Sequence, residues 1–330
     1  VSTKTVIERI SHDISVPSSL NLNSVSKLMM DHSGLLWIGT WGGGLNKYNT
    51  RQTAFRSIRY SPTNELGLSH PDVRSILELQ DGRWLFGTAE NGVDIFDTHF
   101  NRIGSIRHQA NDENSLPLGV ISSLAQTEDG KVWVGLINKG LFELDLSTNT
   151  LSHQILTTNE SAHSIYRIVA DNNNLWVGTG NGVFYVNRSN QKAKPLVDQD
   201  GNIIEIRTNA IGIDKEKNVW VGTSSGLLYK ANNSEYALRF SHEKGNNQTI
   251  SSNQVSGILV DSKNRVWVDT GAGLNRLVSI EAEAAIFESI SQNINMPGYY
   301  FGGNLQEDSA GHIWTQWSFL DPVTNQFLEV

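Results

Sequence analysis

Residues 36–40 read Leu-Trp-Ile-Gly-Thr, and this short phrase decides the fold because it returns along the chain. It reads Val-Trp-Val-Gly at 132–135, Leu-Trp-Val-Gly-Thr at 175–179 and Val-Trp-Val-Gly-Thr at 219–223. A period in the forties with several short strands per unit is typical of a β-propeller blade. The steps between copies are 48, 48, 43, 44, 47 and 47 residues, counted on the column that holds Gly39, Gly87, Gly135, Gly178, Gly222, Asp269 and Gln316.

Each unit predicts four antiparallel strands. A short apolar strand such as 25–30 comes first, followed by a turn rich in Gly, Asn and Asp, which tolerate the positive φ of a tight hairpin. The Leu-Trp-Ile strand comes next, with the aromatic and branched residues of a half-buried strand. A second glycine turn leads to a third strand, as in 45–48, and a less regular fourth strand closes the unit, as in 55–58. The sequence therefore predicts an all-β fold, a seven-bladed β-propeller with four antiparallel strands per blade.

Length and composition agree with one closed propeller. The chain has 330 residues, and because the repeat is unbroken we expect a single β-propeller domain over 1–330, with repeats of about 43–48 residues. The net charge is −8, with 26 basic and 34 acidic residues and no basic cluster, so we expect no nucleic-acid partner. Cysteine is absent, which excludes disulfides and thiolate metal sites. The nine histidines lack metal-site spacing and no catalytic motif occurs, so we predict no metal, no cofactor and no catalytic residue.

Two repeated positions predict how the blades pack. The tryptophan column, which begins with Trp37, is expected to wedge each blade against the next, its N–H reaching a neighbouring carbonyl. Small residues recur on the innermost strand, where blades crowd the axis, and we favour packing over a ligand-lining role for them. These small residues are Ser75, Ser123, Ala210 and Gly257, and the large exceptions on the same strands are Lys27, Arg74, Tyr166 and Arg167.

The first repeat carries a family resemblance. From Asp31 to Tyr48 it reads Asp-x-x-Gly-x-Leu-Trp-Ile-Gly-Thr-x-x-Gly-Gly-Leu-x-x-Tyr, preceded by Ser24 and Val25. This pattern closely resembles the regulator-propeller repeat of two-component sensor proteins, and its copies cover essentially the whole chain. The resemblance implies an extracytoplasmic sensor domain, the periplasmic part of an inner-membrane receptor. In such receptors, propeller repeats precede a small β-sandwich, a membrane span and an output module, either a histidine kinase or a cyclic-dinucleotide domain.

The resemblance also implies partners. The better-known members of the family respond to carbohydrates, so the expected ligand is an oligosaccharide or another small polar molecule. The other expected partners are neighbouring domains of the same receptor, and a homodimer is a further option. Membrane attachment is expected only through segments of a longer parent protein.

Both ends of the chain suggest a piece excised from a longer receptor. The chain begins at Val1, and no signal peptide or apolar membrane span is visible. Residues 6–10 and 326–330 both look like fourth strands, so eight candidates serve seven blades. Because pairing one terminus into the last blade removes an exposed edge, we expect the N-terminal segment to close the ring.

Loops at one end of the blades predict a ligand site. The turn after each second strand opens onto the face that also carries the inter-blade connections, here called the top face, and such loops are a natural place for a ligand. Aromatic rings beside planar polar groups suit a sugar, and they equally suit a wet protein interface. Drift of a terminal repeat also explains the unusual residues of units six and seven, and the tyrosines before unit seven are equally compatible with a hydrophobic plug. The candidates are Trp41, Glu90, Asn138, Lys139, Asp269, Gln316 and Trp317, with Asn181, Ser224 and Ser225 in equivalent turns and Tyr299 and Tyr300 before unit seven.

Three functions remain open at this point. A ligand-sensing module of a membrane receptor predicts binding at the top face without turnover. A scaffold that binds another protein predicts an exposed apolar patch and no pocket. A propeller enzyme acting on polysaccharide predicts clustered titratable groups with perturbed pKa values. We favour them in that order.

Overall fold

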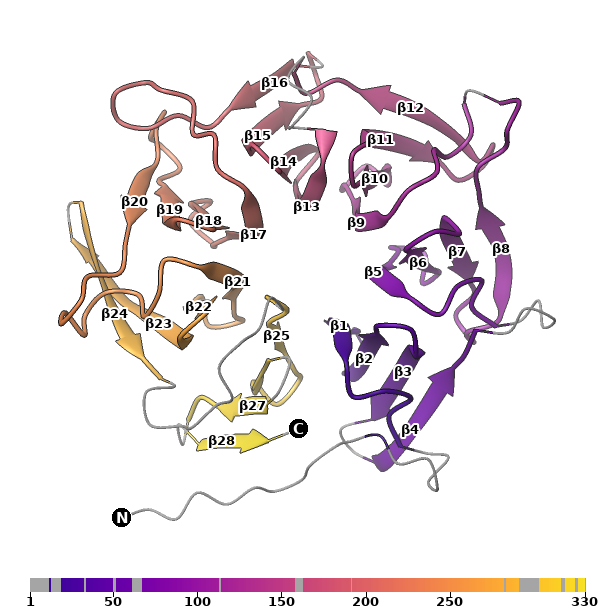
Figure 1. Ribbon diagram of the computed structural model, residues 1–330, viewed down its shortest axis with the longest axis horizontal. Helices are drawn as coiled ribbons and strands as arrows, with labels where there is room; N and C mark the ends of the chain where they lie inside the picture. Colours follow the sequence, from indigo (N-terminus) through magenta and orange to yellow (C-terminus); the bar gives the residue numbers. More distant parts are fainter. Residues whose placement is uncertain are drawn as a thin grey trace.

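The computed structural model describes residues 12, 19–32, 34–49, 52–60, 67–112, 114–157, 163–190, 192–281, 283–290, 303–315, 318–323 and 326–329. These residues form seven four-stranded antiparallel sheets. Figure 1 shows the sheets arranged as blades around a central opening, with one strand of each blade innermost. No α-helix occurs among the described residues. The predicted all-β, seven-bladed propeller is confirmed.

Each blade uses four strands that follow one another in the sequence, and the first of them is innermost. The strands of blades 1 to 3 are β1 (Val25–Met30), β2 (Leu35–Thr40), β3 (Gly44–Asn49), β4 (Gln52–Ile58), β5 (Val73–Glu78), β6 (Trp84–Thr88), β7 (Val93–Phe96), β8 (Arg102–Ile106), β9 (Ile121–Gln126), β10 (Val132–Leu136), β11 (Gly140–Asp145) and β12 (Thr150–Gln154). The strands of blades 4 to 7 are β13 (Ile165–Asp171), β14 (Asn174–Thr179), β15 (Gly182–Asn187), β16 (Lys192–Pro195), β17 (Thr208–Ile213), β18 (Val219–Thr223), β19 (Gly226–Lys230), β20 (Leu238–Phe240), β21 (Val255–Val260), β22 (Val266–Thr270), β23 (Gly273–Glu281), β24 (Ala284–Ser289), β25 (Gln306–Glu307), β26 (Ile313–Trp314), β27 (Ser318–Asp321) and β28 (Gln326–Glu329).

A β-bulge marks the innermost strand near its start. In β1 the register shifts between Val25 and Lys27, so Ser26 is the extra residue. The innermost strands of blades 2 to 6 carry the same irregularity. A bulge re-aims the side chains around it and is common at the rims of closed sheets. Just after the bulge, one residue of the innermost strand in each of blades 1 to 6 pairs with the repeated glycine column, as Lys27 pairs with Gly39.

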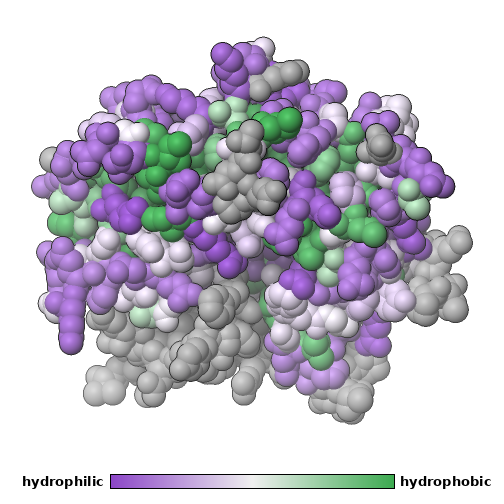
Figure 2. All heavy atoms as spheres, turned by 45° about the horizontal axis from the view of Figure 1, so that its top comes forward, coloured by the Kyte–Doolittle hydropathy of each residue, from purple (hydrophilic) through white to green (hydrophobic). Residues whose placement is uncertain are grey.

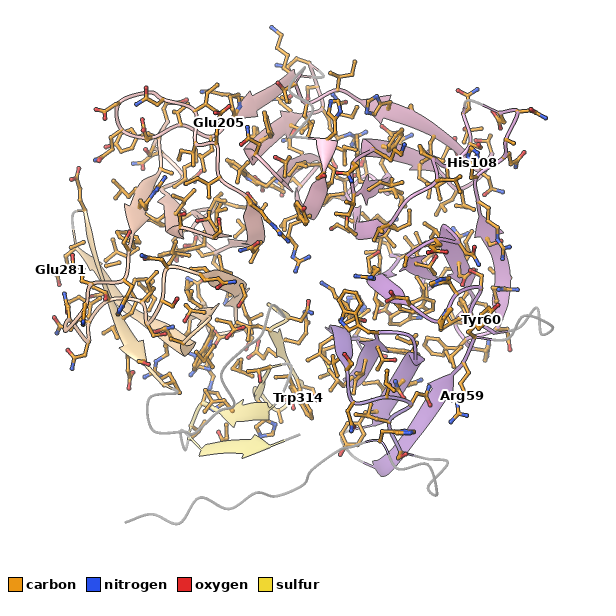
Figure 3. All side chains as sticks on the ribbon, viewed as in Figure 1. Arg59, Tyr60, His108, Glu205, Glu281 and Trp314 are labelled. Atoms are coloured by element: carbon orange, nitrogen blue, oxygen red, sulfur yellow. The ribbon has the colours of Figure 1, made fainter. Side chains whose placement is uncertain are left out.

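The repeated tryptophan packs each blade on the next, as predicted. Trp37 is fully buried, and its ring lies 5.0 Å from Trp84 and 6.2 Å from Phe86 of blade 2, measured between ring centroids. The last interface uses the same wedge, since Trp314 on the flank of blade 7 packs against Tyr48 of blade 1 at 6.2 Å (Figure 3). Truncating a buried ring of this size costs on the order of 3–5 kcal/mol. The wedges are therefore major contributors to the stability of the ring.

The acceptor of the tryptophan N–H differs from the prediction of a neighbouring carbonyl. In blade 1, Trp37 Nε1 donates to the Asp31 carboxylate at 2.8 Å, six residues earlier in the chain. The same bond forms in blades 5, 6 and 7 at 3.1, 2.9 and 2.9 Å. The acceptor is thus an aspartate in the first turn of the same blade. Because this carboxylate also accepts backbone N–H groups of its turn, as Asp31 does from Leu35, it fixes the hairpin and the wedge together.

Two tryptophans lack this partner. The indole N–H groups of Trp133 and Trp176 are buried without a hydrogen-bond acceptor. In blade 3, Thr127 stands six residues before Trp133, where blades 1, 5, 6 and 7 have aspartate. In blade 4 the hairpin is one residue shorter, so Asp171 stands only five residues before Trp176 and pairs with a lysine of blade 5 instead. Turn length, and not only residue type, decides whether the wedge is capped.

The fourth strand of blade 7 comes from the C-terminus. β28 pairs antiparallel with β27 and completes the last sheet. The expectation that the N-terminal segment takes this place is therefore wrong, and residues 6–10 lie outside the described residues. The physical reason is local: β28 follows β27 through a short turn, and a hairpin closes with a much smaller loss of chain entropy than pairing across the whole chain. The ring itself closes between blades 7 and 1, where the Asn304 side-chain amide donates to the Ser26 carbonyl at 2.9 Å.

Candidate functional site

A repeated backbone bond defines the top face. The residue after the second strand donates its N–H to a carbonyl of the connection that enters the innermost strand. In blade 1, Trp41 donates to Ser24 at 2.9 Å, and in blade 2, Ala89 donates to Asp72 at 3.1 Å. Blades 3, 4 and 6 repeat this bond. The turns after the second strands and the inter-blade connections therefore share one face, as the sequence predicted.

Trp41 is an exposed aromatic residue of the top face, and a neighbouring arginine holds its ring in place. Its side chain is 44% exposed, and the Arg74 guanidinium lies 3.5 Å from the ring centroid. Arg74 is held in turn by the Asp72 carboxylate at 2.9 Å. An arginine fixed by a carboxylate and stacked on an indole orients the ring before any ligand arrives. The free ring face is then available for an apolar C–H surface of a ligand.

A second arginine–aromatic pair lies near the same end of the axis. Arg207, which precedes β17, places its guanidinium 4.2 Å from the Tyr166 ring at the start of β13. Tyr166 and Arg74 occupy the bulge position of their strands, which re-aims their side chains. The sequence showed both as exceptions to the small-residue column but did not place them in the ligand site. Arg207 was missed, because a residue outside the repeat phrase gives no periodic signal.

Other predicted site residues have structural roles or stand apart. The Asn138 side chain is hydrogen-bonded to the Ser164 hydroxyl of blade 4, and its backbone φ is 60°, so this residue fixes a turn between blades. Glu90 and Lys139 are exposed in the turns of blades 2 and 3. The Asn181 amide contacts Glu205 of the next connection at 3.3 Å. Gln316, Trp317, Tyr299 and Tyr300 lie outside the described residues.

Asp269 is drawn inward rather than presented to a ligand. Its carboxylate accepts a hydrogen bond from the Ser256 hydroxyl at 3.0 Å within the same blade. Burial raises the pKa of Asp269 to about 6, although the Ser256 hydrogen bond acts in the opposite direction. The sequence placed Asp269 beside Trp41 as a top-face group. In the structure it lies on β22, half-buried, with its carboxylate bonded to Ser256 of the same blade.

Three histidines fix inter-blade connections. The Nδ1 atoms of His12, His108 and His242 lie 2.7, 3.1 and 2.9 Å from the backbone carbonyl oxygen eight residues later. A carbonyl accepts, so each ring donates from Nδ1. His108 lies at the outer end of blade 2 (Figure 3), far from the axis. Among the described residues, no group of three or more His, Cys, Asp or Glu is arranged to hold a metal ion.

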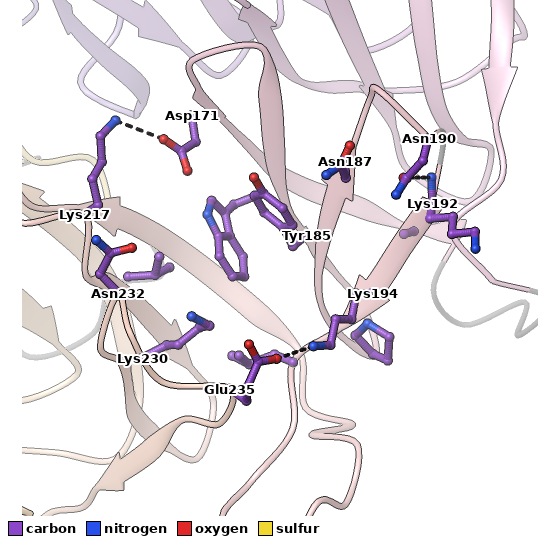
Figure 4. A pocket seen from close by; sticks show the side chains of 15 residues that line it. Asp171, Tyr185, Asn187, Asn190, Lys192, Lys194, Lys217, Lys230, Asn232 and Glu235 are labelled. Carbon is purple, nitrogen blue, oxygen red and sulfur yellow. Dashed lines mark hydrogen bonds and ion pairs between the residues drawn. The ribbon is translucent and has the colours of Figure 1, made fainter.

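A groove between blades 4 and 5 was not predicted. It has a volume of about 630 Å³ and lies at the end of the blades opposite the top face (Figure 4). Lys217 pairs with Asp171 at 2.9 Å across the blades, and Lys194 pairs with Glu235 in the same way. Burial lowers the pKa of Lys230. The groove follows from the short hairpin of blade 4 and from the packing of two blades, neither of which one repeat alone reveals. Its lining also includes Trp176, Tyr185, Asn187, Asn190, Lys192 and Asn232.

The first repeat matches a known family. Residues 19–42, which span β1, β2 and the turn between them, match the family model described as the two component regulator propeller. Blade 1 thus carries the regulator-propeller repeat. The resemblance derived from the sequence is confirmed there. No curated protein matches the chain.

Solved structures share the fold of this propeller. The extracellular domain of a hybrid two component system from B. thetaiotaomicron is 18% identical, with a TM-score of 0.69 over 97% of this chain and 48% of its own. The extracellular domain of a one component system from the same organism is 19% identical, with a TM-score of 0.62 over 92% of this chain and 46% of its own. This chain therefore spans about half the length of those two domains.

An enzyme has the same architecture. A catalytically inactive virginiamycin B lyase from Staphylococcus aureus is 13% identical, with a TM-score of 0.61 over 90% of this chain and 91% of its own. At these identities the likeness establishes the fold. The described residues contain no helix long and apolar enough to cross a lipid bilayer.

Proposed function

We propose that this regulator propeller is a ligand-sensing domain of a bacterial membrane receptor, placed on the extracytoplasmic side. Its ligand is a carbohydrate or another small polar molecule bound at the top face. The proposal is supported by the regulator-propeller repeat and by the likeness to extracellular domains of two component systems. Figure 2 adds that the visible surface is mostly hydrophilic, with hydrophobic atoms in small patches. A surface of this kind suits a polar ligand better than a large apolar interface.

The observation that carries the proposal is the stack of Arg74 on Trp41. A sugar is bound by stacking its C–H face on an aromatic ring while planar polar groups accept or donate hydrogen bonds to its hydroxyls. Trp41 offers the ring, and the exposed Glu90 follows the second strand of the neighbouring blade. A ring already fixed by Arg74 loses little conformational entropy on binding.

Signal transfer then requires a change outside the propeller. A closed ring of seven interlocked blades has little room to deform, so binding acts by shifting how the propeller docks on neighbouring domains. The ligand shifts that equilibrium only by its difference in affinity for the two arrangements. Asp269 is hydrogen-bonded inside blade 6, and we propose binding rather than catalysis for this face.

The test is a thermal-shift screen of the chain against a panel of neutral oligosaccharides, followed by titration calorimetry of any hit. Trp41→Ala should weaken binding about thirtyfold, since truncating a central aromatic anchor typically costs about 2 kcal/mol. Tyr236→Ala removes a similarly exposed ring near β20 and should leave the affinity unchanged. No hit across the panel, or an equal loss in both variants, would rule out a sugar site at Trp41.

A further inference from the structure

The innermost strands contribute one column of side chains to the axis. These residues pair in register with the repeated glycine column, so they hold equivalent places in blades 1 to 6. Four of the six are small, which lets the blades converge, but blades 1 and 4 place Lys27 and Arg167 there. In chain order the column reads Lys27, Ser75, Ser123, Arg167, Ala210 and Gly257.

A cavity lies where this column converges. It has a volume of about 240 Å³, and its lining includes Lys27 and Arg167 together with Ser75, Ser122 and Asn304. Side chains reach into the central opening in Figure 3. A space of this size suits a small ion with part of its hydration shell.

The two cations in this cavity have no counter-charge from the residues that the structure describes. Within the described residues, the Lys27 ammonium group makes no hydrogen bond and no ion pair, and Arg167 donates only to the Tyr166 carbonyl at 2.9 Å. No Asp or Glu is among the lining residues of the cavity. Residues 291–302, which precede the innermost strand of blade 7, also contain no acid. Two positive charges therefore share a confined space in a chain whose net charge is −8.

Electrostatics indicates that this pair of cations destabilises the folded state when no anion is bound. Loss of solvation and, as a smaller cause, the Arg167 charge together lower the pKa of Lys27 to about 7. Loss of solvation also lowers the pKa of Arg167, with a second contribution from Arg207. Both side chains are half-buried, and a poorly solvated cation without a partner is destabilising. Retaining two of them at one place is explained when a bound anion neutralises them.

The other charged groups near the innermost strands are already engaged. Arg74 pairs with Asp72 at 2.9 Å, and Arg207 stacks on Tyr166 at 4.2 Å. The Glu307 carboxylate accepts from Ser262 of blade 6 at 2.6 and 2.7 Å. Asp269 accepts from Ser256. These groups leave Lys27 and Arg167 as the pair that faces the cavity without a carboxylate.

We propose that the central cavity binds a small oxyanion, such as sulfate, phosphate or a carboxylate, between Lys27 and Arg167. The guanidinium presents a planar fork that matches two oxygens of such an ion, and the ammonium adds up to three further donors. The site goes beyond the carbohydrate proposal and does not rest on it, because it uses none of the top-face residues named there.

The experiment uses the chain as it is, with sodium sulfate and sodium phosphate as probes at pH 6.5 and constant ionic strength set by sodium chloride. Isothermal titration calorimetry should show binding of one anion per chain. Lys27→Met and Arg167→Met should each lower the affinity at least tenfold, and Arg167→Lys should lower it less. Lys244→Met removes the same charge from an exposed connection and should bind like the wild type.

Two further readouts separate binding from a folding defect. Without sulfate, Lys27→Met should melt at or above the wild-type temperature, because it removes an unpaired cation. Wild-type affinity should fall between pH 6 and pH 8.5 as Lys27 loses its proton, whereas Lys27→Met should show a weaker pH dependence. Absence of binding, or equal sulfate stabilisation of the wild type and both Met variants, would overturn the proposal and indicate a general salt effect. Because the sugar test depends on Trp41 and this one on Lys27, either proposal can fail alone.

Discussion

Single residues show how the repeat tolerates exceptions. Five blades have glycine in the column that faces the next innermost strand, and blade 6 has Asp269 there. The residue of the next blade that faces this column is β-branched in blades 2 to 6, beginning with Val73. The cost of placing Asp269 in the column is electrostatic, because its carboxyl sits where desolvation disfavours the charge.

Asp269 should make stability depend on pH in a defined window. Its folded pKa is about 6, raised by burial above the ordinary value of 3.8 for an aspartate. Between these two values the folded state holds a proton that the unfolded state has released, so stability falls as pH rises, by up to about 3 kcal/mol. Urea unfolding at pH 4, 5, 6 and 7 should show wild type losing this amount relative to Asp269→Asn. Asp200→Asn, in an exposed turn, is the control, and a difference between wild type and Asp269→Asn that is constant with pH would contradict the assignment.

Whole strands are positioned by the glycine column. A Cβ added to Gly135 of β10 would lie 2.5 Å from Cγ2 of Ile165 on β13 of the next blade. Equivalent glycines in blades 2, 4 and 5 meet β-branched side chains at 2.4 to 2.7 Å. The backbone φ at these glycines is not positive, so their role is close approach rather than a turn. The glycine of the repeat phrase is therefore an interface residue between blades.

Gly135→Ala should destabilise the propeller by about 1–3 kcal/mol, because the added methyl group forces β10 and β13 apart. Gly104→Ala is the matched control, since its added Cβ would meet its nearest atom at 3.8 Å in ordinary contact. That variant should be neutral or slightly stabilising. Urea or thermal unfolding measures both. Equal melting temperatures for the two variants would show that the blades relax without cost.

The elements that repeat could be predicted from the sequence, and the contacts between blades could not. The apolar strands and the tryptophan wedge follow from local periodicity, so the seven blades were predicted correctly. The indole acceptor Asp31 required knowing that the turn folds back over the ring. The stack of Arg74 on Trp41 joins two blades, and no spacing within one repeat encodes it. The groove at Trp176 depends on a hairpin one residue shorter than its equivalents.

At the scale of the whole molecule, the ring is closed by a side-chain wedge and completed by a C-terminal strand. Trp314 of blade 7 packs into the core of blade 1 with Leu36 and Tyr48. β28 covers the edge of β27. An uncovered strand edge is a template for pairing with another chain. The C-terminal strand therefore protects blade 7 as well as completing it.

Removing residues 324–330 should expose the β27 edge, lower the melting temperature and promote self-association. Size-exclusion chromatography with light scattering and thermal unfolding measure the two effects. Removing residues 1–11 is the paired control, since β28 already pairs with the β27 edge, and it should leave both measurements unchanged. If removing residues 1–11 had these effects and removing residues 324–330 did not, the N-terminal segment would be the one that completes blade 7.

The bond between Asn304 and Ser26 joins positions 278 residues apart, and it sets the order of events on the ribosome. Blade 1 emerges before blade 7, yet the flank that receives Trp314 stays uncovered until blade 7 has been synthesised. At about 5–20 residues per second, this wait lasts roughly 15 to 55 s. The propeller is therefore an open arc while its blades are being synthesised, and the ring can close only after blade 7 has left the exit tunnel.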